Sequence, residues 1–303
     1  MADVILNTIS KRYNKSSLLA VDEVSFSVAK GELFGLIGPD GAGKTSIFRI
    51  LTTLLLPDSG SATVNGYDII KDYKTIRSKV GYMPGKFSLY QDLTVEENLD
   101  FFATVFNTSI EKNYELIKDI YVQIEPFKTR RAGKLSGGMK QKLALCCALI
   151  HKPNVLFLDE PTTGVDVVSR REFWEMLQLL KKQGITILVS TPYMDEATLC
   201  DRIALIQTGK ILSIDAPAAI VKQYPEELYA IKASGMNQLL QDLRNRTEVK
   251  NCFAFGEYLH VSFQNDVHEH TILKQLQEAG HEALELKRVV PTIEDCFIHL
   301  MKS

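Results

Sequence analysis

Residues 32–45 read ELFGLIGPDGAGKT, and this stretch decides the fold of the first two-thirds of the chain. Residues 32–37 form a short apolar run of strand length, and a glycine-rich turn separates them from a helical run at 45–55. The turn at 38–45 fits the pattern GxxxxGK[ST], which binds nucleotide phosphates when it follows a strand and opens a helix. We therefore expect a phosphate-binding loop here rather than a glycine-rich turn without a ligand.

Each part of this loop has its own expected role. Glycines let backbone N–H groups converge on the phosphates, and the helix N-terminus adds partial positive charge. Lys44 is expected to hold the β- and γ-phosphates, and Thr45 to supply a hydroxyl group to Mg²⁺. The residues expected to contact the nucleotide are Gly38, Pro39, Asp40, Gly41, Ala42, Gly43, Lys44, Thr45 and Ser46.

An acidic pair, Asp159-Glu160, ends the apolar run VLFL at 155–158. A carboxylate at the tip of a central strand suits the binding of Mg²⁺ through water, and we expect this role for Asp159. Glu160 is placed to orient and polarise an attacking water as a general base. The alternative is that the pair only caps the segment that follows.

A second glycine-containing segment, LSGGMKQK at 135–142, precedes apolar residues at helical spacing up to Ile150. Alone, this segment is weak evidence of function, because Ser136 is simply a good N-cap for a helix. Followed by FLDEP at 157–161, it becomes specific.

Strands and helices alternate through the first two-thirds of the chain. Another apolar run of strand length lies at 185–189, after a helical run at 170–182 that ends at Gly184. No comparable strand is expected between residues 91 and 150, where the runs 93–106, 111–125 and 139–150 are helical in pattern. The sequence thus predicts an α/β core with a mainly parallel sheet and a helical insertion.

The pattern changes after Ala216-Pro217. The expected elements there are a strand at 228–233, a helix at 237–245, a hairpin of 249–255 with 258–263, a helix at 269–279, a strand at 283–289 and a closing helix at 292–301. The order β-α-β-β-α-β is that of a ferredoxin-like unit. We therefore expect two domains, at residues 1–217 and 218–303.

The composition is that of an ordinary globular protein. The 303 residues are 45% apolar and 24% charged, which excludes disorder, and a net charge of -2 argues against nucleic-acid binding through bulk electrostatics. No apolar run approaches the ~18 residues that a membrane-spanning helix needs, and the N-terminus does not resemble a secretory signal. We expect a cytosolic chain that acts at a membrane only through a partner. The five cysteines are expected to be small apolar side chains in a reducing compartment.

Four motifs together resemble the ATP-binding cassette (ABC) ATPases over about residues 4–217: GPDGAGKT at 38–45, LSGGM at 135–139, LFLDEP at 156–161 and TTGVD at 162–166. The whole chain, including TIEDCFIHLM at 292–301, resembles the ATP-binding subunits of ABC-2-type exporters, the drug-resistance branch. This resemblance implies a P-loop NTPase fold with a RecA-like core, an N-terminal β-subdomain and the helical insertion. It also implies ATP and Mg²⁺ as cofactors, ATP hydrolysis coupled to transport, and a separate membrane permease that holds the chain at the inner face of the membrane.

The resemblance assigns further roles to matching positions. Tyr13 stands where an aromatic residue stacks on adenine, with a core tyrosine as the alternative. Ser136, Gly137 and Gly138 would bind the γ-phosphate of ATP held by a second ATPase subunit, because such subunits close head-to-tail around two nucleotides. The insertion at about 85–150 would receive the coupling helix of the permease. For the C-terminal domain we favour a dimerisation or spacing module without a ligand.

Two positions depart from the family pattern. After GYMP the family has a glutamine that touches Mg²⁺ and the attacking water, and here Gly85 and Lys86 follow, with Gln91 as a distant candidate substitute. After Ser190-Thr191 the family has a histidine that contacts the γ-phosphate, and here Pro192 stands there, without a side-chain donor. We therefore expect a slow ATP site that pairs with a different, complete cassette.

Two alternatives for the function remain open. One is a nucleotide-binding regulatory subunit with little hydrolysis, and the other is a soluble ABC protein that acts on ribosomes or DNA. His268 and His270 are expected to be solvated rather than metal-binding. A basic cluster before LSGG is expected to be a solvated surface, with a contact to the membrane subunit as the alternative; it comprises Lys128, Arg130, Arg131 and Lys134. The sequence names neither the exported substrate nor the identity of the partner ATPase.

Overall fold

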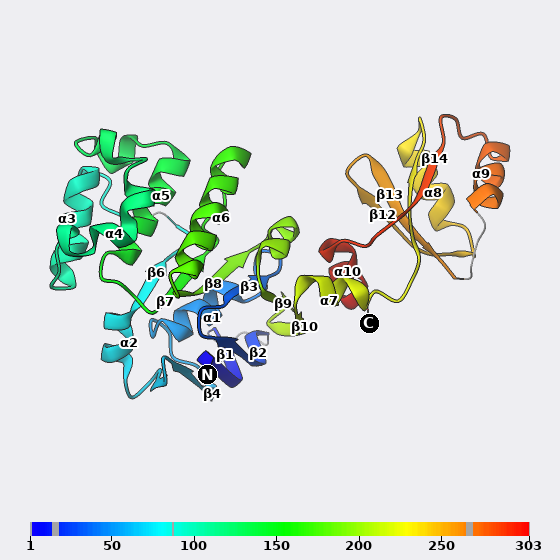
Figure 1. The fold of residues 1–303 in the computed structure, drawn as a ribbon. Helices are drawn as coiled ribbons and strands as arrows, with labels where there is room; N and C mark the ends of the chain where they lie inside the picture. The colour runs from blue at the N-terminus through cyan, green and yellow to red at the C-terminus, as the bar shows by residue number, and fades with distance from the viewer. Residues whose placement is uncertain (1, 14–17, 87, 265–268, 303) are drawn as a thin grey trace. The chain divides into compact units, whose positions relative to one another are not determined.

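The computed structural model describes residues 2–13, 18–86, 88–264 and 269–302. It divides the chain into two compact units, Met1–Ile220 and Val221–Ser303 (Figure 1). The boundary lies three residues beyond the expected division after residue 217, and helix α7 (Pro217–Lys222), which the sequence pattern did not reveal, runs through it.

The first unit is built on a six-stranded sheet in the order β10-β9-β3-β8-β7-β6. Its strands are β3 (Leu33–Ile37), β6 (Val80–Met83), β7 (Val155–Asp159), β8 (Thr186–Thr191), β9 (Arg202–Gln207) and β10 (Lys210–Asp215). All neighbours are parallel except the edge strand β10, which is antiparallel to β9. Every residue of β3, β7 and β8 is buried, which explains the apolar run that each of them contains. The mainly parallel α/β core is confirmed.

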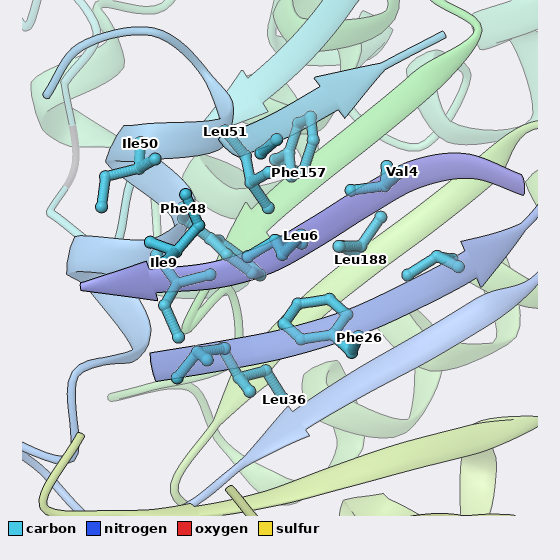
Figure 2. Packing of buried hydrophobic residues seen from close by; sticks show 14 of the residues in the cluster. Val4, Leu6, Ile9, Phe26, Leu36, Phe48, Ile50, Leu51, Phe157 and Leu188 are labelled. Atoms are coloured by element: carbon cyan, nitrogen blue, oxygen red, sulfur yellow. The ribbon is translucent and has the colours of Figure 1, made fainter. Parts of the chain in front are cut away.

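A four-stranded antiparallel sheet in the order β2-β1-β4-β5 packs over this core. Its strands are β1 (Ala2–Arg12), β2 (Leu19–Ala29), β4 (Ser59–Val64) and β5 (Tyr67–Asp68). Figure 2 shows Leu6 of β1 and Phe26 of β2 in one buried cluster with Phe48 of α1 and Phe157 of β7. The cluster holds helix α1 (Lys44–Leu51) against the sheet, and so fixes the loop that precedes it.

Helix α1 ends four residues earlier than expected, because Thr53 adopts a left-handed conformation with φ 63°. Helix α2 (Tyr73–Lys79) precedes β6, and α6 (Val167–Lys182) precedes β8, with a 3₁₀ helix, Met194–Leu199, after that strand.

The helical insertion consists of α3 (Val95–Val105), α4 (Ile110–Tyr121) and α5 (Gly137–Leu149), with α5 packed against the other two. The run expected at 111–125 ends as an α-helix at Tyr121 and continues as a separate 3₁₀ turn, Glu125–Phe127, which contains Pro126. Among the described residues between 91 and 150 the structure has no strand, only an isolated bridge between Thr94 and Arg131.

The second unit has the sheet order β12-β13-β11-β14, with every neighbour antiparallel. Its elements are β11 (Leu228–Lys232), α8 (Met236–Arg244), β12 (Val249–Phe255), β13 (Tyr258–Phe263), α9 (Glu269–Glu278), β14 (Glu285–Val289) and α10 (Ile293–Leu300). This is the ferredoxin-like arrangement, as predicted. A separate core includes Ile231, Val261, Leu239 of α8 and Leu276 of α9. His260 of β13 is hydrogen-bonded at 2.8 Å to Asp295 of α10.

Within the part of the chain that the structure describes, no helix is both long and apolar enough to cross a membrane.

Candidate functional site

The loop between β3 and α1 depends on two of its glycines. A Cβ atom at Gly38 would clash with the carbonyl oxygen of Ile206, and one at Gly43 with that of Ala20. Gly43 also has φ 105°, a conformation that only glycine adopts readily. It is the N-cap of α1 and provides no capping side chain, so the N–H groups of the first helical turn remain available to an anion.

These groups border a cavity of about 260 Å³. Its lining comprises Tyr13, Ala20, Gly41, Gly43, Lys44, Thr45, Ser46 and Glu160. The structure thus brings together residues from three separate parts of the sequence. Of the other expected loop residues, Asp40 is exposed and Ala42 is buried.

Tyr13 lies at the edge of this cavity. Its side chain is 41% exposed, and its hydroxyl group lies 3.0 Å from that of Ser46. The alternative of a core tyrosine is therefore wrong. An exposed ring tethered beside a phosphate loop is free to stack on a base.

Lys44 is almost completely buried, with 3% of its surface exposed. Its ammonium group donates to the carbonyl oxygens of Gly38 (2.8 Å) and Pro39 (3.0 Å). The same group lies 3.0 Å from Oε1 of Glu160. The loop and the acidic pair therefore meet at this one cation.

The acidic pair lies at the carboxyl end of β7, which is the strand next to the edge strand β6. Asp159 is 2% exposed, and its Oδ1 accepts a hydrogen bond from the Ser190 hydroxyl at 2.7 Å. Glu160 has a left-handed backbone with φ 52°. The next helix, α6, is capped by Asp166, whose side chain accepts from Ser169 N. The acidic pair is therefore not the cap of the following helix.

The charge of Asp159 affects the pKa of Tyr82 on the neighbouring strand β6. Burial, reinforced by this charge, raises the pKa of Tyr82 to about 12. The phenol therefore stays neutral at physiological pH.

The donor chemistry of the site fits Mg²⁺. The Thr45 hydroxyl and the Asp159 carboxylate are hard oxygen donors, and Mg²⁺ usually takes one or two carboxylates together with substrate phosphates. A cage of protein ligands is not required, and among the described residues there is no group of three or more His, Cys, Asp or Glu that could hold a metal.

The residues of the SGG turn, Ser136, Gly137 and Gly138, are not among those that line this cavity. Ser136 is the N-cap of α5 and accepts from Met139 N at 3.3 Å. Gly138 is buried against Ser169 at the start of α6, whereas Gly137 is exposed. One chain therefore offers two separate sets of groups, the loop with the acidic pair and the exposed SGG turn.

The two departures follow the two strands that neighbour β7, the strand that leads into the acidic pair. A Cβ atom at Gly85 would lie 3.0 Å from the carbonyl oxygen of Asp159 and 3.7 Å from the Glu160 Cβ atom. Pro192 directly follows β8, the strand that pairs Ser190 with Asp159. Gln91 is exposed, and its carbonyl oxygen accepts from Gly133 N at 2.9 Å in the helical insertion, so the structure does not bring it to the acidic pair.

One buried carboxylate, four residues after Pro192, carries no local sequence signal. Glu196 is 2% exposed and accepts hydrogen bonds from Thr162, Thr191 and Arg170. Only the general rarity of buried acids could have marked it, because its partners are scattered along the sequence.

A second cavity of about 200 Å³ lies where β6 meets the helical insertion. Its lining includes Met83 at the end of β6, Pro84 directly after it, Phe102 and Phe106 of the insertion, and His151. The ring of His151 stacks on that of Phe106 with 3.8 Å between centroids, and burial lowers its pKa. The aromatic part of this lining is therefore uncharged, although Arg77 also lines the cavity.

The remaining candidates are surface or core residues. His270 is exposed at the start of α9, and His268 lies outside the described residues. The basic residues Lys128, Arg130, Arg131 and Lys134 are exposed, and Lys128 pairs with Glu96 at 3.4 Å. All five cysteines are buried and unbridged.

Known proteins that are similar to this chain in sequence or in fold are ATP-binding proteins of transporters. A family model described as "ABC transporter" matches residues 21–163. The "Nod factor export ATP-binding protein I" of Rhizobium sp. (strain N33) is 34% identical over 99% of this chain and 98% of its own length. The "Probable multidrug ABC transporter ATP-binding protein YbhF" of Escherichia coli (strain K12) is 38% identical over 99% of this chain, which spans only 52% of that relative.

A solved structure described as "Structure of ATP binding subunit of ABC transporter" has a TM-score of 0.66 and 27% identity, and covers 73% of this chain and 92% of its own. The site geometry, the family model and a relative matched along almost its whole length agree. The chain therefore belongs to the ATP-binding proteins of the ABC transporter family and has their P-loop NTPase fold.

Proposed function

We propose that the chain is the ATP-binding subunit of an ABC-2-type exporter, where it binds and hydrolyses MgATP to drive a separate membrane permease. The observation that carries this proposal is the meeting of the phosphate loop and the acidic pair at Lys44, beside a cavity at the N-terminus of α1, where the N-cap Gly43 provides no side chain. The exporter names of the two relatives support transport as the setting.

In this proposal, Lys44 and the first-turn N–H groups bind the β- and γ-phosphates, and Tyr13 stacks on the adenine. Thr45 and Asp159 would hold Mg²⁺, which when bound neutralises charge on the phosphates. Glu160 orients the attacking water and accepts its proton at the side-chain carboxylate.

The chain's own site would be slow. Gly85 lies against the acidic pair yet provides no side chain, and Pro192 has no donor at the end of β8. Losing one preorganised contact in a catalytic site typically costs about 10²–10³ in rate. We propose that the chain forms the degenerate half of an asymmetric pair, and that its Ser136-Gly137-Gly138 turn completes a competent site on a different cassette.

The apolar groove between β6 and the insertion is our candidate site for the permease. Its aromatic floor suits a short amphipathic helix, and its position next to Gly85 would link permease contact to the acidic pair. Through this contact the chain would sit peripherally at the inner face of the membrane.

A second function, a regulatory subunit that binds ATP with little hydrolysis, is favoured by the same glycine and proline. In a mixture of the chain with its partner cassette, Gly137→Asp tests the pairing that both functions share, and Glu160→Gln separates them, because a subunit without hydrolysis would lose no ATPase activity. Gly137→Asp should abolish the activity of the mixture, whereas Glu160→Gln should reduce it only modestly. Position 137 has room for a side chain, because a Cβ atom there would lie 3.7 Å from its nearest neighbour, the carbonyl oxygen of Gly164. Loss of activity in Gly137→Asp would therefore not result from a clash within the chain. A mixture that remains fully active with Gly137→Asp would contradict the proposed pairing.

A further inference from the structure

We propose that Ser190 is a positioning residue, whose hydroxyl group fixes the directions of Asp159 and Glu160 at the metal and water side of the site. This inference rests on the proposed function only in taking the acidic pair as the metal-binding and water-orienting groups.

Ser190 holds both members of the pair. It lies on β8 directly opposite Asp159 of β7 and is fully buried. Its hydroxyl donates to Asp159 Oδ1 at 2.7 Å and accepts the backbone N–H of Glu160 at 3.0 Å. The same N–H also donates to the Ser190 carbonyl oxygen at 3.1 Å.

The contact with Asp159 decides which carboxylate oxygen remains for a ligand. A hydroxyl has one proton to donate, and here it is committed to Oδ1. Oδ2 is then the oxygen left for Mg²⁺ or its water. Partners of this kind orient a metal-binding carboxylate, and removing them typically weakens metal binding about 10–100-fold.

The contact with Glu160 holds an unusual backbone. A φ of 52° is uncommon for a residue with a side chain, and the bonds to Ser190 hold the peptide in that conformation. The side chain of the same residue reaches Lys44 at 3.0 Å. Rotation of the peptide would turn the carboxylate away from the phosphate loop.

The role of Ser190 is larger in this chain because the residues at positions 85 and 192 provide no side-chain hydrogen bond to the acidic pair. Gly85 has no side chain, and Pro192 has no donor. Within the described part of the chain, the Ser190 hydroxyl is hydrogen-bonded to both acidic residues, to the side chain of Asp159 and to the backbone of Glu160.

The same strand offers a matched control. Thr186, four residues earlier on β8, is also fully buried. Its hydroxyl donates to a carboxylate, Asp3 Oδ2, at 2.6 Å and accepts a backbone N–H, that of Gly31, at 2.8 Å. Thr186→Val therefore removes an equivalent pair of hydrogen bonds at the other end of the strand.

The test measures metal binding, not turnover. The full chain is titrated with the fluorescent nucleotide MANT-ADP in EDTA and then at rising Mg²⁺, and the bound metal is followed by electron spin resonance with Mn²⁺ in place of Mg²⁺. We expect Ser190→Ala to bind MANT-ADP in EDTA like the wild type, but to need about tenfold more metal for the metal-dependent response. Thr186→Val should keep the wild-type metal requirement, and Ser190→Thr, which retains a hydroxyl, should restore most of it.

Three results would overturn the role of Ser190: an unchanged metal requirement in Ser190→Ala, an equal rise in Thr186→Val, or a Ser190→Thr variant as weak as Ser190→Ala. Should Ser190→Ala fail to fold, Ser190→Cys replaces it, because a thiol is a similarly small but weak donor. A wild-type chain that binds no MANT-ADP at all would contradict the proposed function itself.

Discussion

Glu160→Gln should tighten nucleotide binding rather than weaken it. Glu160 and the nucleotide phosphates are anions that use the same cation, since the Glu160 carboxylate lies 3.0 Å from the Lys44 ammonium group. A phosphate that enters the loop must therefore displace this carboxylate or share Lys44 with it. Neutralising the side chain while keeping its size removes the competitor and its repulsion of the phosphates.

The size of the effect follows from the burial of the pair. Lys44 is almost inaccessible, with 2% of its side chain exposed against 22% for Glu160. Two unit charges at about 4 Å interact by about 4 kcal/mol at the effective dielectric of a protein surface. The glutamine amide oxygen still accepts a hydrogen bond from Lys44, so only part of this energy is released. We expect a gain of about 1–2 kcal/mol, which corresponds to roughly 5–30-fold in affinity.

The assay is equilibrium binding of MANT-ADP, which separates affinity from hydrolysis. The matched control is Glu175→Gln, which makes the same change in charge at an exposed pair with Arg171 and should leave affinity unchanged. Lys44→Ala should weaken binding by a few kcal/mol, the order expected for removal of a charged partner. Unchanged or weaker binding by Glu160→Gln would refute the competition for Lys44.

Three further predictions concern the loop, the domains and pH. Gly43→Ala should abolish MANT-ADP binding, because its Cβ atom would meet Ala20 O at a φ that alanine avoids; binding like the wild type would contradict the assigned loop geometry. A chain of residues 1–222, cut after α7, should still bind MANT-ADP, because the second unit has a core of its own; a folded fragment that does not bind would contradict the division into domains. Because burial raises the pKa of Tyr82 to about 12, the stability it contributes is complete below the unfolded value of 10.0 and is lost as pH rises through 12. Chemical unfolding between pH 9 and 12 should show a smaller alkaline loss in Tyr82→Phe, and an identical loss would contradict the shift.

The sequence predicted the elements that have a simple period or a continuous apolar run. The hairpin at 249–255 and 258–263 was predicted with the bounds of the structure, because its strands are regular and its turn contains Gly256. Strands β1 and β2 were not identified individually, because irregular pairing and the left-handed residues Thr8 and Glu23 interrupt their alternation.

The residues of the candidate site that lie within local sequence motifs could be predicted, whereas the contacts between distant motifs could not. Lys44 and Glu160 could be named from local patterns, but their contact could not, because 115 residues of intervening fold bring them together. Ser190 and Glu196 were missed as site neighbours for the same reason. Their roles depend on which strands are adjacent in the sheet, and no local pattern carries that order.

The central claim is that the site built on Lys44, Asp159 and Glu160 holds ATP but hydrolyses it slowly, because Gly85 and Pro192 replace two catalytic side chains. Single-turnover hydrolysis, with the chain in excess over radiolabelled MgATP, tests this claim most directly. We expect the bound nucleotide to remain largely ATP, with a hydrolysis rate about 10²–10³-fold or more below that of a complete site. Prompt conversion to ADP that Glu160→Gln abolishes would contradict it.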